Sequence, residues 1–298
     1  MEDPSVEEGS STTRPYSAGS PWVFKGRALY QLHVVKADVA RKVIPKELKL
    51  VEAFGFTLGG FFLAHYDGSP AGQFDEAVII PGIVWNPPTS CAWAGRVLVG
   101  SEEARDHGRK EVGLPSFAAQ FAYSSIREDA APFAWWDVRR WLNKGGKPSS
   151  IIKHSMHLVQ KERGVSSPLC SMHGLPERLT SSDKDHRRWS GPSVQLYLPN
   201  FSGKTKEQPH LLKYSCRLNC NVSAVAPVKI APPSNAEKIN DDTNDVLAVL
   251  TGKPLVSIFF DHMVMSVEAP TIVSMKEMDD VQAVTSSQVP AAPSASAS

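Results

Sequence analysis

Two pairs of side chains have the residue types and the spacing of metal ligands. Cys216 and Cys220 lie four residues apart, and His154 and His157 lie three apart. A structural zinc site needs four ligands, and no further Cys or His cluster stands close to either pair in the sequence. We therefore expect no metal site. The cysteines fit the buried face of a strand, and the histidines fit a surface helix within residues 151–159.

A third group could bind a surface rather than a metal. Trp135, Trp136 and Trp141 cluster beside Arg139 and Arg140. Aromatic rings next to cations can mark a membrane-surface or protein-partner site. We favour a helix over residues 129–142 that packs its aromatic side on the body of the protein, and we keep partner docking as the alternative.

The common catalytic patterns are missing from the chain. GxSxG, HExxH, the P-loop and GxGxxG do not occur, which removes the commonest hydrolase, metalloprotease and nucleotide-binding interpretations. We expect no cofactor. The net charge of +1 and the pI near 7.7 give no reason to expect nucleic-acid binding.

Composition is that of a globular protein, with 42% hydrophobic and 21% charged residues. No apolar run approaches the roughly 20 residues that span a bilayer, so we do not expect an integral membrane protein. Four cysteines are too few for a disulfide scaffold. The acidic N-terminus fits neither a secretory signal nor a transit peptide, so the cytoplasm is the expected location.

One domain over residues 21–274 is the simplest organisation. Residues 1–20 and 275–298 are rich in small and polar side chains that cannot bury enough apolar surface to fold, and we interpret them as disordered tails.

Within the domain the dominant pattern is that of strands. Alternation in residues 211–225 puts Cys216, Leu218 and Cys220 on one face, and Gly59 with Gly60 predicts a bulge or a close backbone approach. Strands are predicted over 28–35, 57–66, 77–85, 91–99, 194–198, 211–225 and 255–268, and helices over 38–44, 102–107 and 129–142. Residues 235–250 are interpreted as an acidic insertion followed by a short helical or strand-like run. The fold class is therefore mostly β (α+β), antiparallel, with a few peripheral helices.

Residues 108–116, with the sequence GRKEVGLPS, resemble the active-site segment of acetoacetate decarboxylases. Residues 24–27 (FKGR), 40–48 (ARKVIPKEL) and 72–76 (GQFDE) extend the resemblance in the same order. A closer resemblance is to the plant neoxanthin-deficient family of the same superfamily, through residues 55–64, 85–94, 108–116 and 211–216. The resemblance implies an acetoacetate decarboxylase-like antiparallel β-cone or barrel.

The resemblance also implies roles for individual residues. In decarboxylases of this superfamily a lysine follows the proline and forms a Schiff base, whereas Ser116 follows Pro115 here and has no amine. Arg27 and Glu76 match a pocket arginine that can hold a carboxylate and a pocket acid or base. Phe61 stands where a second pocket carboxylate is expected. We expect Arg27, Glu76, Ser116 and Phe61 to line one pocket, and we regard Lys110 as an improbable substitute for the nucleophile.

The family implies a role in neoxanthin formation, and through it in abscisic acid supply. We expect a protein that is not a decarboxylase and that binds a small apolar or amphipathic ligand or a protein partner. The alternative is an enzyme that uses the same pocket without an imine, for proton transfer, hydration or isomerisation of a carboxylate-bearing substrate. A third interpretation is a pure scaffold. The superfamily commonly assembles, so a homo-oligomer is compatible with the resemblance.

Overall fold

The structure is a computed structural model that describes residues 14–86, 89–128, 151–162, 164–180, 191–233 and 241–273. The predicted helix over 129–142, with its tryptophans, lies outside these described residues, as do residues 1–13 and 274–298. The described part begins with a short helical turn, η1 (Tyr16–Ala18), inside the segment that the sequence assigns to the N-terminal tail.

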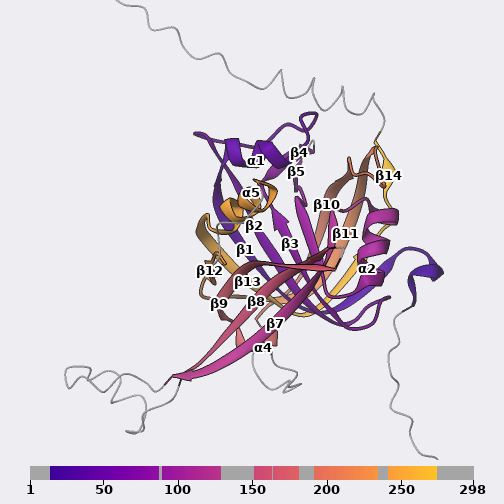
Figure 1. The fold of residues 1–298 in the computed structure, drawn as a ribbon. Coiled ribbons are helices and arrows are strands. Elements are labelled where there is room, and N and C mark those ends of the chain that lie inside the picture. The colour runs from indigo at the N-terminus through magenta and orange to yellow at the C-terminus, as the bar shows by residue number, and fades with distance from the viewer. Residues whose placement is uncertain are drawn as a thin grey trace, which may run out of the picture.

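One large sheet dominates the molecule (Figure 1). Its strands run in the order β10-β11-β13-β1-β2-β3-β6-β7-β8-β9-β12, with β14 paired to β11. Their bounds are β1 Trp22–Lys36, β2 Phe56–Gly68, β3 Phe74–Ile80, β6 Arg96–Val99, β7 Ser116–Glu128, β8 Ile151–Glu162, β9 Val165–Leu175, β10 Ser193–Gly203, β11 Leu211–Ala224, β12 Lys229–Ala231, β13 Lys253–Val267 and β14 Thr271–Ile272. β4 (Ile83–Asn86) and β5 (Thr89–Ala92) form a separate hairpin.

The mostly antiparallel β fold is confirmed, but the sheet does not close into a barrel. No pairing between the described residues of β10 and β12 joins the two ends of the sheet. The sheet is strongly curved instead (Figure 1). β10 and β12 therefore remain edges of the sheet, so the barrel that the family resemblance implied is left open.

The predicted alternation decides which side chains share a face. In β11 Cys216, Leu218 and Cys220 are buried together, as predicted. In β2 the close backbone approach is also confirmed: a Cβ on Gly60 would lie 2.0 Å from the carbonyl oxygen of Gln31, and one on Gly59 would lie 2.5 Å from that of Ile80. No side chain fits at either position, which explains two glycines inside a strand.

The histidine pair lies on a strand rather than on a helix. His154 and His157 belong to β8, where His154 Nδ1 lies 2.8 Å from Ser125 Oγ and His157 Nδ1 lies 2.8 Å from Ser171 Oγ. The three-residue spacing suggested a helical face, but pairing with β7 and β9 overrides that local pattern.

The two faces of the central strands contribute to two separate apolar clusters. In β1 and β2 the odd-numbered side chains, such as Leu29 and Leu63, join a core that helices α1 (Ala37–Val43) and α5 (Asp241–Leu250) cover (Figure 1). The even-numbered side chains, such as Ala28 and Ala64, join a second apolar cluster on the opposite face. A short helix, α4 (Glu177–Thr180), packs near β1.

Candidate functional site

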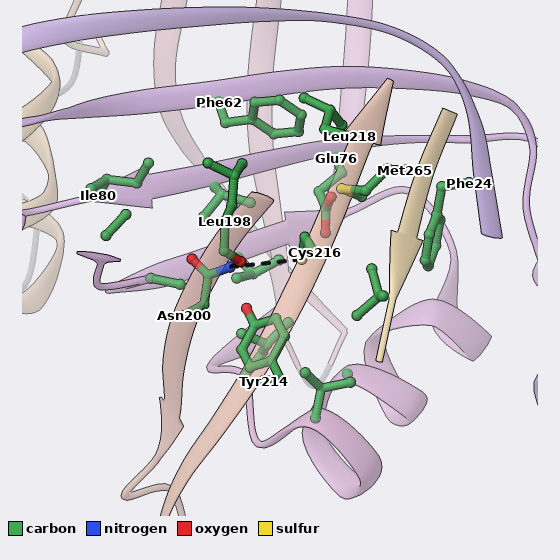
Figure 2. Close-up of a pocket in the computed structure, with 18 of the residues that line it drawn as sticks. Phe24, Phe62, Glu76, Ile80, Leu198, Asn200, Tyr214, Cys216, Leu218 and Met265 are labelled. Carbon is green, nitrogen blue, oxygen red and sulfur yellow. Dashed lines mark hydrogen bonds between the residues drawn. The ribbon is translucent and has the colours of Figure 1, made fainter. Parts of the chain in front are cut away.

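A cavity of about 460 Å³ lies on the face of the sheet that carries the even-numbered side chains. Most of its wall is apolar and comes from β1, β3, β10, β11 and β13, and Figure 2 shows Phe24, Phe62, Leu218 and Met265 around it. The volume falls in the usual range for small-molecule sites, about 300–1,000 Å³.

One crossover connection brings Ser116 to this cavity. β6 and β7 pair in parallel, with Val97 opposite Ser116, so the chain must cross from the end of one to the start of the other. It does so through α2 (Glu102–His107), whose first turn is capped by Ser101 Oγ accepting from the Ala104 backbone N–H, and through the helical turn η2 (Gly108–Val112). Gly113 ends this turn in the left-handed region, with φ 72°.

Ser116 itself is 1% exposed and lies directly against the crossover. A Cβ on Gly108 would lie 2.7 Å from Ser116 Oγ, so the glycine leaves room for this hydroxyl. The Arg109 Nε–H donates to the Ser116 carbonyl oxygen over 2.6 Å, which holds the start of β7 against the turn. Residues 108–116 therefore form a helical turn and a strand start, not the extended segment that would direct Lys110 inward, and Lys110 is exposed.

Glu76 contributes the carboxyl group of the cavity. It lies on β3, and the Tyr66 hydroxyl of the neighbouring β2 donates to its Oε2 atom over 2.6 Å. The carboxyl is enclosed by protein yet keeps some accessible surface, and it belongs to the cavity lining. Burial raises the pKa of Glu76, and the Tyr66 hydrogen bond offsets only part of that effect.

Other polar groups approach the same space. Figure 2 shows Asn200 of β10 with Tyr214 and Cys216 of β11 at the cavity, and the Asn200 amide donates to Cys216 Sγ at 3.7 Å. Burial raises the pKa of the Cys216 thiol to about 12, and it raises the pKa of Tyr214 well above its usual value. Glu76 adds to both shifts, because a negative carboxylate would disfavour a second anion nearby.

An aromatic wall forms another part of the cavity. The Tyr16 ring stacks on His107, with ring centroids 3.7 Å apart, and Trp22 meets His107 edge-on at 4.3 Å. Burial lowers the pKa of His107 to about 4, so the imidazole is neutral at physiological pH. Tyr16 lies within residues 1–20, so composition alone did not identify this contribution. The His107–Trp22 contact likewise depends on the crossover, which sequence spacing does not reveal.

The pKa shifts of the cavity groups all favour the uncharged form of the group, which defines the electrostatic character of the cavity. Each lining group with a resolved shift is pushed toward its neutral form: Glu76, Tyr16, Tyr30, Cys91, Tyr214 and Cys216 upward, and His107 downward. The described lining contains neither Lys nor Arg. The cavity therefore combines a largely apolar wall with a few hydrogen-bonding groups whose neutral forms are favoured.

Two of the four predicted pocket residues line the cavity and two do not. Glu76 and Ser116 belong to the lining, whereas Arg27 and Phe61 are not part of it. Both sit at odd-numbered positions of β1 and β2, so their side chains extend from the opposite face of the sheet. Phe61 is fully buried in the core beneath the helices, edge-on to His33.

Arg27 is engaged elsewhere. Its Nη1 donates to both carboxylate oxygens of Asp67, at 3.0 and 3.1 Å, and its Nε donates to the Leu179 carbonyl oxygen at 3.3 Å. Asp67 also approaches His65, whose Nδ1 lies 2.7 Å from Asp75 Oδ1. The Asp67 and Asp75 hydrogen bonds raise the pKa of His65 to about 9. This charged network lies on the face opposite the cavity, so the structure does not direct Arg27 toward a ligand carboxylate there.

Two further features bear on the choice of function. No group of three or more His, Cys, Asp or Glu among the described residues could hold a metal ion. None of the helices in that described part of the chain is both long and apolar enough to cross a membrane. In the same segment Glu111 is exposed, and Arg109 approaches Glu207 at 4.0 Å.

Three curated proteins resemble the chain over most of its length. Protein NEOXANTHIN-DEFICIENT 1 of Solanum lycopersicum is 47% identical over 294 residues, covering 90% of this chain and 97% of the relative. The proteins of the same name from Oryza sativa and Arabidopsis thaliana are 45% and 43% identical, covering 90% and 86% of this chain and 94% of each relative. No protein-family profile matches.

Solved structures show the fold at much lower identity. Acetoacetate decarboxylase from Legionella pneumophila superimposes with a TM-score of 0.51 at 12% identity, over 92% of each chain. The enduracididine biosynthesis enzyme MppR, with HEPES buffer bound, gives a TM-score of 0.50 at 13% identity, over 90% of this chain and 91% of the other. The fold is therefore acetoacetate decarboxylase-like, as the sequence resemblance implied.

Proposed function

The chain belongs to the neoxanthin-deficient 1 family, and from this premise we propose that it acts in neoxanthin formation by binding an uncharged, largely apolar ligand in the Glu76 cavity. The ligand class is that of a hydroxylated or oxygenated isoprenoid, such as one end of a carotenoid. The ligand places an oxygen atom against Glu76 and its hydrocarbon part against the aromatic and aliphatic wall.

One observation carries the proposal: the described lining of the cavity contains neither Lys nor Arg. A keto-acid site needs a cation for the carboxylate, and the described lining offers none. Burying an anion here would leave it without a partner, which costs several kcal/mol even after relaxation. An apolar ligand with a hydroxyl group instead gains from area burial and makes its hydrogen bond with the Glu76 carboxyl.

Ser116 argues against imine chemistry in the same space. The serine hydroxyl takes the position that the family resemblance assigns to the Schiff-base lysine, and Lys110 is exposed outside the cavity. Without an amine the site has no electron sink for decarboxylation. We therefore propose a protein that keeps the superfamily's fold and cavity and has a different use for them.

A second candidate function rests on Glu76. Burial raises the pKa of Glu76 and so favours its protonated form, which can donate a proton or a hydrogen bond. Tyr66 occupies Oε2, which leaves Oε1 for a ligand oxygen. The enzyme alternative is thus narrowed to acid-assisted isomerisation or hydration of a neutral substrate, with no role for Arg27 as a carboxylate clamp.

Thermal-shift measurements with panels of xanthophylls, shorter oxygenated isoprenoids, fatty acids and keto acids test the first candidate. A ligand present at 100 times its dissociation constant stabilises the protein by roughly 2.7 kcal/mol. We expect shifts from neutral isoprenoids and none from keto acids. Glu76→Ala should weaken the shift, and Glu111→Ala, at an exposed glutamate outside the lining, serves as the matched control.

The outcomes separate the two candidates and can overturn both. Conversion of a bound isoprenoid that Glu76→Gln abolishes, with binding retained, would favour the enzyme. Shifts from keto acids alone would contradict the uncharged-ligand proposal. No shift from any panel would leave a scaffold role as the better interpretation.

A further inference from the structure

A turn at the outer end of β2 carries an exposed phenylalanine in an unfavourable backbone conformation. Ala53 and Phe56 exchange two backbone hydrogen bonds, of 2.8 and 3.0 Å, around Phe54 and Gly55. Both central residues have positive φ, 53° and 78°. Such a two-residue turn favours Asn-Gly, because asparagine tolerates the left-handed region and a bulky side chain does not.

The side chain of Phe54 gains nothing from packing in return. It is 100% exposed, so it has neither the backbone preference nor the burial that would explain phenylalanine here. A residue that costs folding free energy twice, through its backbone and through its exposed ring, points to a role outside the fold.

Apolar side chains extend from this turn along one face of the sheet. We call them the apolar strip: Leu32, Val34, Phe56, Leu58 and Val256. The register places Val34 opposite Leu58 and Leu32 opposite Val256, so they share the face with even-numbered positions of β1 and β2. Phe56, Leu58 and Val256 are 44%, 38% and 37% exposed.

The apolar strip continues directly into the ligand cavity. Tyr30 follows Leu32 on the same face of β1, and Phe62 lies opposite Tyr30 on β2. Tyr30 and Phe62 both line the cavity. An apolar molecule that left the cavity along these strands would therefore meet further apolar side chains.

The outer end of the apolar strip carries positive charge. Lys36 lies opposite Phe56, and Lys253 lies opposite Val34; both side chains are exposed. The glutamate just before the turn, Glu52, is paired with Arg41. An aromatic tip, an apolar face and flanking lysines are the composition that binds the interface of an anionic bilayer.

We propose that the Phe54 turn and the apolar strip dock this protein on an anionic lipid surface. The Phe54 ring enters the interface, the apolar strip rests on it, and Lys36 and Lys253 face the lipid headgroups. Docking would place the protein where apolar isoprenoids partition, with the strip linking the lipid surface to the cavity.

Co-sedimentation of the full chain with vesicles of phosphatidylcholine, with and without phosphatidylglycerol, tests the docking. We expect binding that depends on phosphatidylglycerol and weakens with salt. Phe54→Asn should reduce the partition coefficient at least about tenfold, because a buried phenylalanine contributes that much or more. Lys36→Gln and Lys253→Gln should each reduce it roughly fivefold.

Phe54→Asn is informative because its effects on folding and on binding have opposite signs. Asparagine suits the turn, so the thermal midpoint should hold or rise while vesicle binding falls. Ile272→Asn, at another exposed apolar side chain on β14, is the control that should leave binding unchanged.

Vesicle binding that survives Phe54→Asn, or no binding to either vesicle, overturns the proposal. Self-association in sedimentation velocity that Phe54→Asn abolishes would also overturn it, because a second copy would then cover the apolar strip. Ligand-induced thermal shifts of the Phe54→Asn variant should equal those of the parent, so failure here is separable from failure of the cavity proposal.

Discussion

Tyr66 donates its hydroxyl hydrogen to Glu76 Oε2 over 2.6 Å, from β2 to the adjacent β3. Tyr66 is fully buried, so this bond fixes the carboxyl group and leaves Oε1 as its remaining hydrogen-bonding atom. A protonated Glu76 held in this way can donate through Oε1 while it accepts from Tyr66, which suits a ligand hydroxyl or carbonyl oxygen.

Glu76→Gln should make the protein more stable at alkaline pH. Burial raises the pKa of Glu76 in the folded state, so its contribution is fully present below the unfolded pKa, near 4.5, and is lost as pH rises through the folded value. The neutral amide removes that loss, at roughly 1.4 kcal/mol for each unit of pKa shift. Denaturant unfolding at pH 5 and pH 8 checks this. An equal change at both pH values would contradict a raised pKa.

Ser116→Lys should give the cavity an amine that reacts with carbonyl compounds. The lysine would start from the serine position in the lining and be desolvated by the apolar wall, which lowers the pKa of an amine and makes it nucleophilic. Borohydride reduction with a neutral aldehyde, followed by peptide mass spectrometry, should find an adduct on residue 116. The parent protein should give no adduct in the cavity, and trapping at Lys110 in the parent would revive imine chemistry.

Arg27→Ala should lower stability without changing ligand binding. Arg27 bonds Asp67 and the Leu179 carbonyl oxygen on the face opposite the cavity. Because Asp67 is 54% exposed, the pair contributes about 1 kcal/mol or less. Thermal melts with and without a cavity ligand measure both effects. A lost ligand shift in Arg27→Ala, at unchanged fold, would return this arginine to the binding site.

His65 should make stability fall between about pH 6.5 and pH 9. Hydrogen bonds to Asp67 and Asp75 raise the folded pKa of His65 to about 9, so the stabilisation is fully present below the unfolded pKa of 6.5 and is lost as pH rises through 9. After allowance for solvent screening we expect about 1 kcal/mol. His65→Gln should flatten the pH dependence in this window, and an unchanged slope would exclude His65 as its source.

Local patterns predicted β1, β2, β10, β11 and β13, because alternation and glycine placement are decided by neighbours along the chain, but they missed β7 and β9. The face of β11 that carries Cys216 and the close approach at Gly60 both follow from such rules. His154 was misplaced on a helix because a three-residue spacing does not reveal the pairing of β8 with its two neighbours.

Only two of the four predicted pocket residues line the cavity, because the face of the sheet from which a side chain extends alternates along each strand. Motif order brought Glu76 and Ser116 to the cavity, but a one-position difference along a strand sends a side chain to the other face, as with Arg27 and Phe61. Tyr16 and His107 could not be found from spacing, since a crossover between parallel strands brings His107 to the wall where Tyr16 stacks on it.

The reaction rate of the buried cysteines can be used to measure how often the cavity opens. All are free and buried, and Cys91 and Cys216 belong to the cavity wall. Only a thiolate reacts with an alkylating reagent, and burial raises the pKa of both thiols to about 12. Alkylation of either thiol therefore requires the cavity wall to open. The rate at which a maleimide reagent labels Cys91 and Cys216 in the native protein therefore reports the frequency of cavity opening, and any molecule that fills the cavity should slow this labelling.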